Sequence, residues 1–81
     1  MTRRLEPDEL TSPGAWKTLL GTKVSLRYRI HGDRSHPFSE AIGMVQSVVE
    51  DSDGSATLTV VNRRGEAATM VLDDILAAKS L

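Results

Sequence analysis

The residues with the most obvious chemical potential stand in one short segment, where the chain's only two histidines, His31 and His36, accompany Asp33 and Ser35. These residue types ligate metals, or act as a nucleophile with its base and orienting acid. The spacing fits neither role, because a loop with glycine and proline does not hold both histidines on one face. A catalytic triad draws its groups from separate segments of a rigid scaffold. We therefore predict a solvated loop, with no catalytic residue, no metal site and no bound cofactor.

Basic side chains form a second set of candidate functional residues, because they can bind anionic groups of a partner. Alternation over Thr22–Ile30 places Lys23, Arg27 and Arg29 on the face of a strand opposite its apolar residues. Two further arginines precede a glycine in a later turn. We predict that these cations and the polar loop after the strand form a candidate interaction surface. Its members are Lys23, Arg27, Arg29, His31, Arg34, His36, Phe38, Arg63 and Arg64.

Composition bears on the partner of that surface. Strong binders of single-stranded nucleic acid interleave cations with exposed aromatic residues, and grooves for proline-rich peptides are lined by aromatic residues. Aromatic residues make up only 4% of this chain, and its net charge is −1. Tyr28 falls on the apolar face of its strand, and Trp16 is expected to be a packing lid. Another protein or a linked catalytic domain is therefore the expected partner, with nucleic acid as the alternative.

Charge is unevenly distributed along the chain. Residues 1–38 hold seven Lys or Arg against four Asp or Glu, whereas residues 39–81 hold three against seven. Two arrangements are open. The halves remain apart on the folded surface and offer a partner two signs, or the fold mixes them and cancels the asymmetry.

Size and composition limit the setting in which this chain works. Its 81 residues make one small domain. There is no cysteine, so neither a disulfide nor thiolate-bound zinc can stabilise it. Arg3 and Arg4 are followed by acidic residues rather than by an apolar signal segment, and no apolar run approaches the ~20 residues of a membrane span. We expect a cytoplasmic protein that binds no membrane and is a monomer or weak dimer.

A short helix is expected before the first strand. Ser12 is placed to cap it, followed by a proline at the first helical position, and Gly21 is a natural stop. Within it, Trp16 and Leu20 are expected to cover one open end of a barrel. Residues 1–11, which precede this helix, are mostly polar, and we predict that they form a flexible lead-in.

Alternating apolar runs and tight-turn signals predict the remaining elements. The turns Asp51–Gly54 and Asn62–Gly65 separate the later runs, and Gly43 marks a bend or bulge in a long second strand. A helical turn over Asp73–Leu76 precedes the last run. Residues 12–81 therefore predict an all-β, five-stranded SH3-like barrel with a short N-terminal helical segment and a 3₁₀ or helical turn before the last strand. The five expected strands are Thr22–Ile30, Glu40–Glu50, Ala56–Val61, Ala67–Leu72 and Ala77–Leu81.

Three stretches are similar to the SH3-like N-terminal domain of certain actinobacterial GNAT-type N-acetyltransferases. Gly21–Ile30 resembles the opening strand of that domain, and Val60–Glu66 resembles a strand–turn–strand in which two basic or polar residues precede a glycine. Leu72–Lys79 resembles its closing signature, an Asp followed by two aliphatic residues, two small residues and Lys. Ala41–Val49 also fits the second strand of the family.

The resemblance implies an accessory role. In that family the barrel precedes a catalytic domain that binds acetyl-coenzyme A, but no glycine-rich acetyl-coenzyme A motif occurs in this chain. A GNAT fold also needs roughly twice this chain length. The implied function is a non-catalytic accessory or interaction domain, either part of a larger enzyme or encoded alone, and no catalytic role passes to any residue. A small nucleic-acid-binding β-barrel is the alternative.

Overall fold

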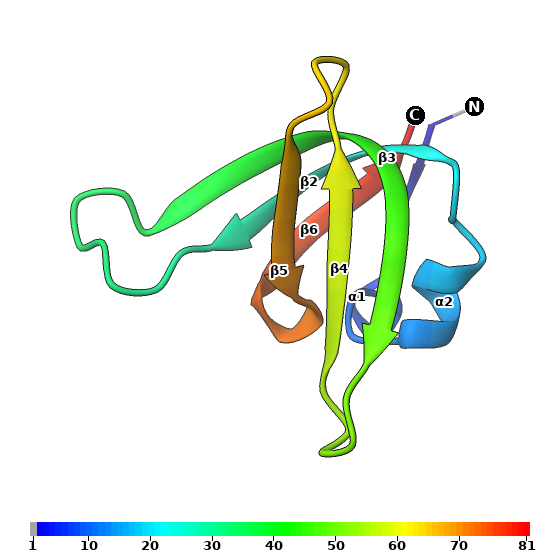
Figure 1. The fold of residues 1–81 in the computed structure, drawn as a ribbon, viewed down its shortest axis with the longest axis horizontal. Helices are drawn as coiled ribbons and strands as arrows, with labels where there is room; N and C mark the ends of the chain where they lie inside the picture. The colour runs from blue at the N-terminus through cyan, green and yellow to red at the C-terminus, as the bar shows by residue number, and fades with distance from the viewer. Residues whose placement is uncertain (1) are drawn as a thin grey trace.

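Five of the six strands follow the alternating runs of the sequence. The computed structural model describes residues 2–81 and places the strands in one sheet that curls into a small barrel (Figure 1). A 3₁₀ turn, η1 (Leu72–Asp74), precedes the last strand, which begins two residues earlier than expected. The predicted all-β barrel with such a turn is thereby confirmed, and a strand that was not predicted, β1 (Arg3–Arg4), adds a sixth to the five expected. These strands are β2 (Lys23–Arg29), β3 (Phe38–Glu50), β4 (Ala56–Val61), β5 (Ala67–Val71) and β6 (Ile75–Ser80).

The strand order explains how so short a chain curls on itself. The sheet runs β1-β6-β2-β3-β4-β5, so β2 and β6, the first and last strands of the predicted five, are neighbours. β3 is 13 residues long and bends across the barrel in Figure 1. Its first half pairs antiparallel with β2, and its second half pairs antiparallel with β4. One long strand thus belongs to both halves of the barrel.

Gly43 makes the bend of β3 possible. This residue is buried, and a Cβ atom at its position would overlap the carbonyl oxygen of Val61 on β4. A register shift between Val45 and Ser47 adds a bulge just beyond the bend. A residue without a side chain lets the two backbones approach, and a bulge increases the local twist. The irregularity predicted at this point of the second strand is confirmed.

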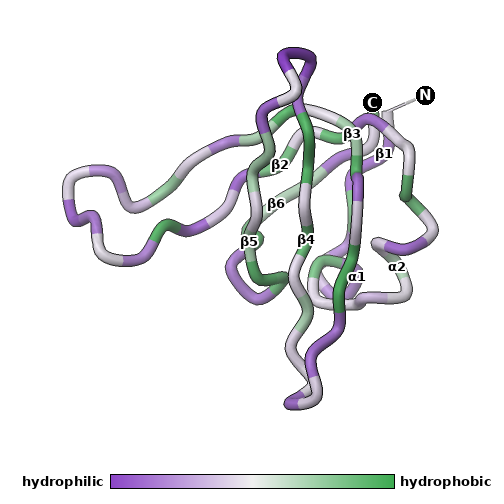
Figure 2. Tube along the Cα trace, viewed as in Figure 1, coloured by the Kyte–Doolittle hydropathy of each residue, from purple (hydrophilic) through white to green (hydrophobic). Residues whose placement is uncertain are grey.

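Alternation fills the barrel with one set of side chains from each strand. In Figure 2 the hydrophobic colour lies along the strands, while the turns at the two ends of β4 are hydrophilic. Burying such apolar surface is the main source of stability for a domain this small. The buried core consists of Leu5, Leu10, Trp16, Val24, Leu26, Val45, Ala56, Leu58, Val60, Met70, Leu72, Ile75 and Ala78.

Residues 2–11 are part of the fold rather than the flexible lead-in expected there. Arg3–Arg4 form β1, which pairs with β6, and Pro7–Leu10 form helix α1. Leu5 and Leu10 are only 3% and 8% exposed, because both side chains pack into the core. The polar composition around these two leucines concealed their contribution, which depends on packing against distant residues.

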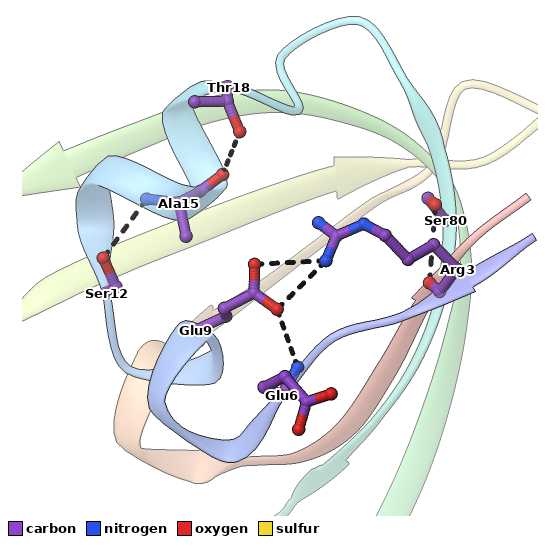
Figure 3. A network of polar contacts seen from close by, with 7 residues as sticks. All are labelled: Arg3, Glu6, Glu9, Ser12, Ala15, Thr18 and Ser80. Atoms are coloured by element: carbon purple, nitrogen blue, oxygen red, sulfur yellow. Dashed lines mark hydrogen bonds and ion pairs between the residues drawn. The ribbon is translucent and has the colours of Figure 1, made fainter.

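A network of polar contacts holds this N-terminal segment (Figure 3). The Arg3 guanidinium donates to both carboxylate oxygens of Glu9, at 3.1 and 3.2 Å, and the Glu6 N–H donates to Glu9 Oε1 at 2.8 Å. The Glu6 N–H and then the Arg3 side chain hold the pKa of Glu9 below its ordinary value of 4.5. At the other end of the network, the Ser80 hydroxyl donates to the Arg3 carbonyl oxygen at 3.4 Å.

Helix α2 (Pro13–Lys17) begins at the predicted cap. The Ser12 hydroxyl oxygen accepts a hydrogen bond from the Ala15 N–H at 3.2 Å, as an N-cap residue does. Trp16 is fully buried, and its indole N–H donates to the Leu10 carbonyl oxygen at 2.9 Å, which joins α2 to α1. Both helices are short, and no helix within residues 2–81 has the length and apolar character needed to cross a membrane.

Leu20 does not share the lid with Trp16, contrary to the expectation from the sequence. Its side chain is 49% exposed, because α2 ends before Leu20 and helical spacing no longer relates the two residues. The connection after the helix runs along β3 instead, where the Gly21 N–H donates to the Val45 carbonyl oxygen at 2.9 Å. Leu19 packs against the core in its place.

The two ends of the chain meet at one place on the barrel. β1 and β6 pair through Arg3 with Ser80 and Arg4 with Lys79, and Figure 1 shows the two strands side by side. The backbone N–H of the last residue also donates to the Lys23 carbonyl oxygen at 2.9 Å. The last residue therefore lies beside the first residue of β2, and β6 separates β1 from β2.

Candidate interaction site

A groove lies between β3 and the turn that joins β4 to β5. Its volume is about 470 Å³, which falls in the range of roughly 300–1,000 Å³ typical of ligand pockets. Ile42 and Met44 of β3 form much of its apolar surface, and each is 52% exposed. The groove is lined by Lys23, Ile42, Gly43, Met44, Val61, Asn62, Arg63, Arg64 and Glu66.

Strand register explains why residues far apart in sequence meet in this groove. Lys23 on β2 pairs with Met44, and Met44 in turn pairs with Val61 on β4. Side chains at paired positions lie next to each other on the same face of a sheet. Since Gly43 and Val45 are buried, the alternate residues of β3 point outward, and the three paired side chains form a row across three strands.

The β4–β5 turn holds its two arginines in a defined shape. Asn62 Oδ1 accepts from the Arg64 N–H at 2.9 Å and from the Glu66 N–H at 3.0 Å, and the Asn62 amide donates to Glu66 Oε1 at 3.1 Å. Gly65 has a φ of +84°, which glycine adopts without strain. The backbone of the turn is thus preorganised, while the side chains of Arg63 and Arg64 are exposed at the groove.

The cations of the groove also lack acidic partners. Within residues 2–81, no carboxylate lies at ion-pair distance from Lys23, Arg63 or Arg64. By contrast, Arg3 and Lys17, near the helices, each form an ion pair with a glutamate. The three groove cations are therefore available to an external anion.

The two kinds of charge occupy opposite ends of β4. The groove and its arginines adjoin Val61, where β4 ends, whereas acidic residues gather in the β3–β4 turn and around η1. Figure 1 shows the two turns at opposite ends of the molecule. The fold mixes the two halves of the sequence, since Arg63 and Arg64 come from the acidic half and Glu50 pairs with Lys17 of the basic half, yet each sign still gathers at its own end of β4. The acidic cluster consists of Glu50, Asp51, Asp53, Asp73 and Asp74.

Hydrogen bonds fix the acidic β3–β4 turn. Asp53 Oδ1 accepts from the Ser55 N–H at 3.0 Å and from the Ser55 hydroxyl at 2.8 Å. These bonds, the backbone one first, hold the pKa of Asp53 below its ordinary value of 3.8. At a pH where an ordinary Asp is half protonated, a larger fraction of this carboxylate is therefore ionised.

Two other members of the predicted surface, Arg27 and Arg29, lie farther along β2. Arg29 pairs with Phe38, six residues from Lys23, and six residues of strand span about 20 Å. The Arg27 guanidinium carbon lies 5.0 Å from the centre of the Phe38 ring, the geometry of a cation–π contact. The structure therefore places Lys23 beside the β4–β5 turn, whereas Arg27 and Arg29 lie toward the other end of β2 and do not line the groove.

The loop between β2 and β3 carries the remaining predicted residues, His31, Arg34 and His36. It extends away from the barrel in Figure 1, and all three side chains are exposed. His31 Nε2 lies 2.8 Å from Asp74 Oδ1, whereas His36 Nδ1 lies 3.7 Å from Asp33 Oδ2. The two histidines thus face different carboxylates, and nowhere in residues 2–81 do three potential metal-ligating side chains come together.

The apolar half of the groove was missed from the sequence. Ile42, Met44 and Val61 are hydrophobic residues in strands, and such residues are expected to face the core. The one available signal was Gly43, because a buried glycine in β3 obliges both of its neighbours to face outward. Asn62, recognised only as a turn residue, was not expected to fix the shape of the site.

Comparison with known proteins gives a family match that covers this site. The family model described as the Rv0428c N-terminal Sm-like domain matches residues 18–79. That range includes every residue that lines the groove. Neither the search of curated proteins nor the search of solved structures gave a significant match.

Proposed function

Because its match extends over residues 18–79, the chain belongs to the Rv0428c N-terminal Sm-like domain family, and we propose that it is a non-catalytic interaction domain. It docks onto another protein or onto a catalytic domain linked to it. The observation that carries this proposal is the groove of about 470 Å³, with exposed apolar side chains at its surface and three unpaired cations around it. Exposed apolar patches rimmed by polar residues are typical of protein interaction sites.

Photo-crosslinking in cells tests this proposal at the groove. Ile42 is replaced by p-benzoylphenylalanine, which inserts into nearby C–H bonds on irradiation. We expect a discrete adduct of higher mass that resists nuclease and is destroyed by protease. Val49 is the matched control position, since it is on the same strand and is similarly exposed, at 54% against 52%. No adduct at position 42 beyond that seen at position 49 would contradict a docking role for the groove.

We also propose that the docked partner is a GNAT-type acetyltransferase module in the cytoplasm. The support is the likeness of Gly21–Ile30, Val60–Glu66 and Leu72–Lys79 to the domain that precedes such modules. The family name itself describes a domain at the N-terminus of Rv0428c, and the lack of cysteine suits a reducing compartment.

Co-expression tests the choice of partner. A GNAT module from the same genome should co-elute with the chain in size-exclusion chromatography. Its co-elution should be lost when both arginines of the turn are reversed, in the variant Arg63→Glu with Arg64→Glu. If every such module elutes separately from the chain, this partner class is wrong. The photo-crosslinking result would then decide whether the groove is a docking site at all.

Nucleic-acid binding is the second candidate function, and the outward basic residues favour it. Arg4, Lys79 and Lys23 lie on adjacent strands, with Arg27 farther along β2, and all are exposed. Cations that contact phosphates release counterions, so such binding weakens steeply as salt rises. Fluorescence anisotropy with a labelled 12-nucleotide RNA at low salt distinguishes this function. A flat titration eliminates it, whereas salt-sensitive binding abolished by Arg27→Ala would support it.

A further inference from the structure

The lining of the groove identifies a class of ligand, on the premise that the groove is a docking site. We propose that it binds a short peptide segment of a partner protein in which aspartate or glutamate residues flank aliphatic ones. The groove offers one surface to each half of such a segment. Its apolar residues would receive the aliphatic side chains, and its cations would receive the carboxylates.

The apolar surface fits small aliphatic groups. Ile42 and Met44 are two residues apart on β3, and outward side chains at that spacing are about 7 Å apart, which matches successive same-side residues of an extended peptide. Both are about half exposed, at 52% each. Methionine is flexible and polarisable, so Met44 can adapt to differently shaped aliphatic groups. Burial of this surface by a ligand would stabilise the complex in proportion to the area covered.

The cations around the groove fit carboxylates. Lys23, Arg63 and Arg64 face only one acidic lining residue, Glu66, so the lining carries a net positive charge. Glu66 is itself held by the Asn62 amide at 3.1 Å. An arginine guanidinium presents paired N–H groups that match a carboxylate, and the hydrogen-bonded turn fixes the backbone that carries both arginines. Complementary charge of this kind selects partners and speeds their association.

The same lining disfavours a nucleic acid in the groove. None of the nine lining residues is aromatic, so a base would find no ring on which to stack. A peptide can place its own carboxylates on the arginines and present an aliphatic side chain instead.

Fluorescence anisotropy with defined peptides tests the ligand class. The probe is a fluorescein-labelled octapeptide in which aspartate and leucine alternate. We expect it to bind, with affinity falling as salt is raised. Octapeptides that alternate aspartate with serine, or lysine with leucine, should bind at least roughly tenfold more weakly, because each lacks one of the two complementary features.

Variants of the groove localise the binding. Met44→Ser should weaken binding of the aspartate–leucine peptide about tenfold, and Arg63→Ala about two- to fivefold, as expected for one exposed ion pair. The matched controls are Val49→Ser on the same strand and Lys17→Ala in α2, outside the groove, which should leave affinity unchanged. All four side chains are exposed, so the circular dichroism spectra of the variants should equal that of the parent chain.

The outcomes separate this proposal from the docking role itself. If position 42 crosslinks to a protein but the aspartate–leucine peptide does not bind, or binds no better than the lysine–leucine peptide, the ligand class is wrong and the docking role stands. Equal weakening by Met44→Ser and Val49→Ser would also overturn the proposal. If an octamer of uridylate binds more tightly than the peptide, and Met44→Ser weakens the binding of that octamer, the groove would be assigned to nucleic acid. Loss of both the peptide and the protein adduct would overturn both proposals.

Discussion

At the scale of single residues, Gly43 sets the shape of both the barrel and the groove. A Cβ atom there would overlap the Val61 carbonyl oxygen, which belongs to the backbone and has little freedom to move. We expect Gly43→Ala to lower the free energy of unfolding by about 3 kcal/mol, as overpacking of a close contact does. Urea denaturation followed by circular dichroism measures the loss.

Gly14→Ala provides the control for this glycine substitution. Gly14 lies in α2, where the nearest atom to a new Cβ would be Ser12 Oγ at 3.8 Å, an ordinary contact. Alanine is a better helix former than glycine, so this variant should be more stable by about 0.5 kcal/mol. A loss at Gly43 no larger than any change at Gly14 would show that the backbones of β3 and β4 separate easily.

Residue-level signals in the sequence predicted some details well and others poorly. The Ser12 cap was predicted because capping is a local property of one residue and the backbone next to it. Leu20 was placed wrongly, because its environment depends on where α2 ends and on the pairing of the following segment with β3. Ile42 and Met44 were not recognised as surface residues, since hydrophobic character alone does not say which face of a strand is buried.

At the scale of elements, α1 depends on one carboxylate. Glu9 accepts from the Glu6 N–H and from Arg3, and its pKa is lowered. A carboxylate whose pKa is lower in the folded state stabilises the fold above its ordinary pKa, here 4.5, and this contribution disappears as pH falls through the lower folded value. We therefore expect Glu9→Gln to reduce the melting temperature at pH 7, and the gap from the parent chain to narrow below pH 4.5.

Thermal melts of both chains between pH 3 and pH 7 measure this effect. Asp8→Asn is the control, since Asp8 is the adjacent acidic residue of the same helical turn and no side-chain hydrogen bond of Asp8 occurs within residues 2–81. Its melting temperature should differ less from that of the parent chain at pH 7. A constant difference between Glu9→Gln and the parent across the whole pH range would show that the charge of Glu9 is not the cause.

The order of the elements was largely predictable, whereas their ends and the first eleven residues were not. Period-two alternation and the glycine-containing turns are repeated signals, and together they specified five strands and the turn before the last one. β1 and α1 carry no such pattern. Leu5 and Leu10 become core residues only because β1 pairs with β6 and α1 packs beside it, which is a long-range property that no local window contains.

At the scale of the whole molecule, the N-terminal segment has two separable roles. It adds Leu5 and Leu10 to the core, and it covers the edge of β6 through β1. Removal of residues 2–10 should cost about 3–6 kcal/mol of unfolding free energy from the two leucines, a large share of the stability of a domain this size. It should also produce concentration-dependent association, because an uncovered strand edge pairs readily with other chains.

Leu5→Ala in the full chain separates the two roles. This substitution should cost about 2–5 kcal/mol but leave β1 paired with β6, so the chain should remain monomeric in sedimentation velocity runs. Leu20→Ala, at a leucine that is 49% exposed, should change stability by no more than about 0.5 kcal/mol. If the truncated chain stays monomeric at all concentrations, β1 does not act as an edge cover.

The position of the C-terminus has a consequence for polypeptide joined to it. The Leu81 N–H is bonded to the Lys23 carbonyl oxygen, so an added segment would start at the border of the groove. A ligand tethered by a short flexible linker experiences an effective concentration of the order of millimolar, which falls as the linker lengthens. A peptide whose affinity is too low to occupy the groove from solution would occupy it when attached at that point. The length of the linker, together with the strength of the contacts, would then decide whether the groove is occupied or free.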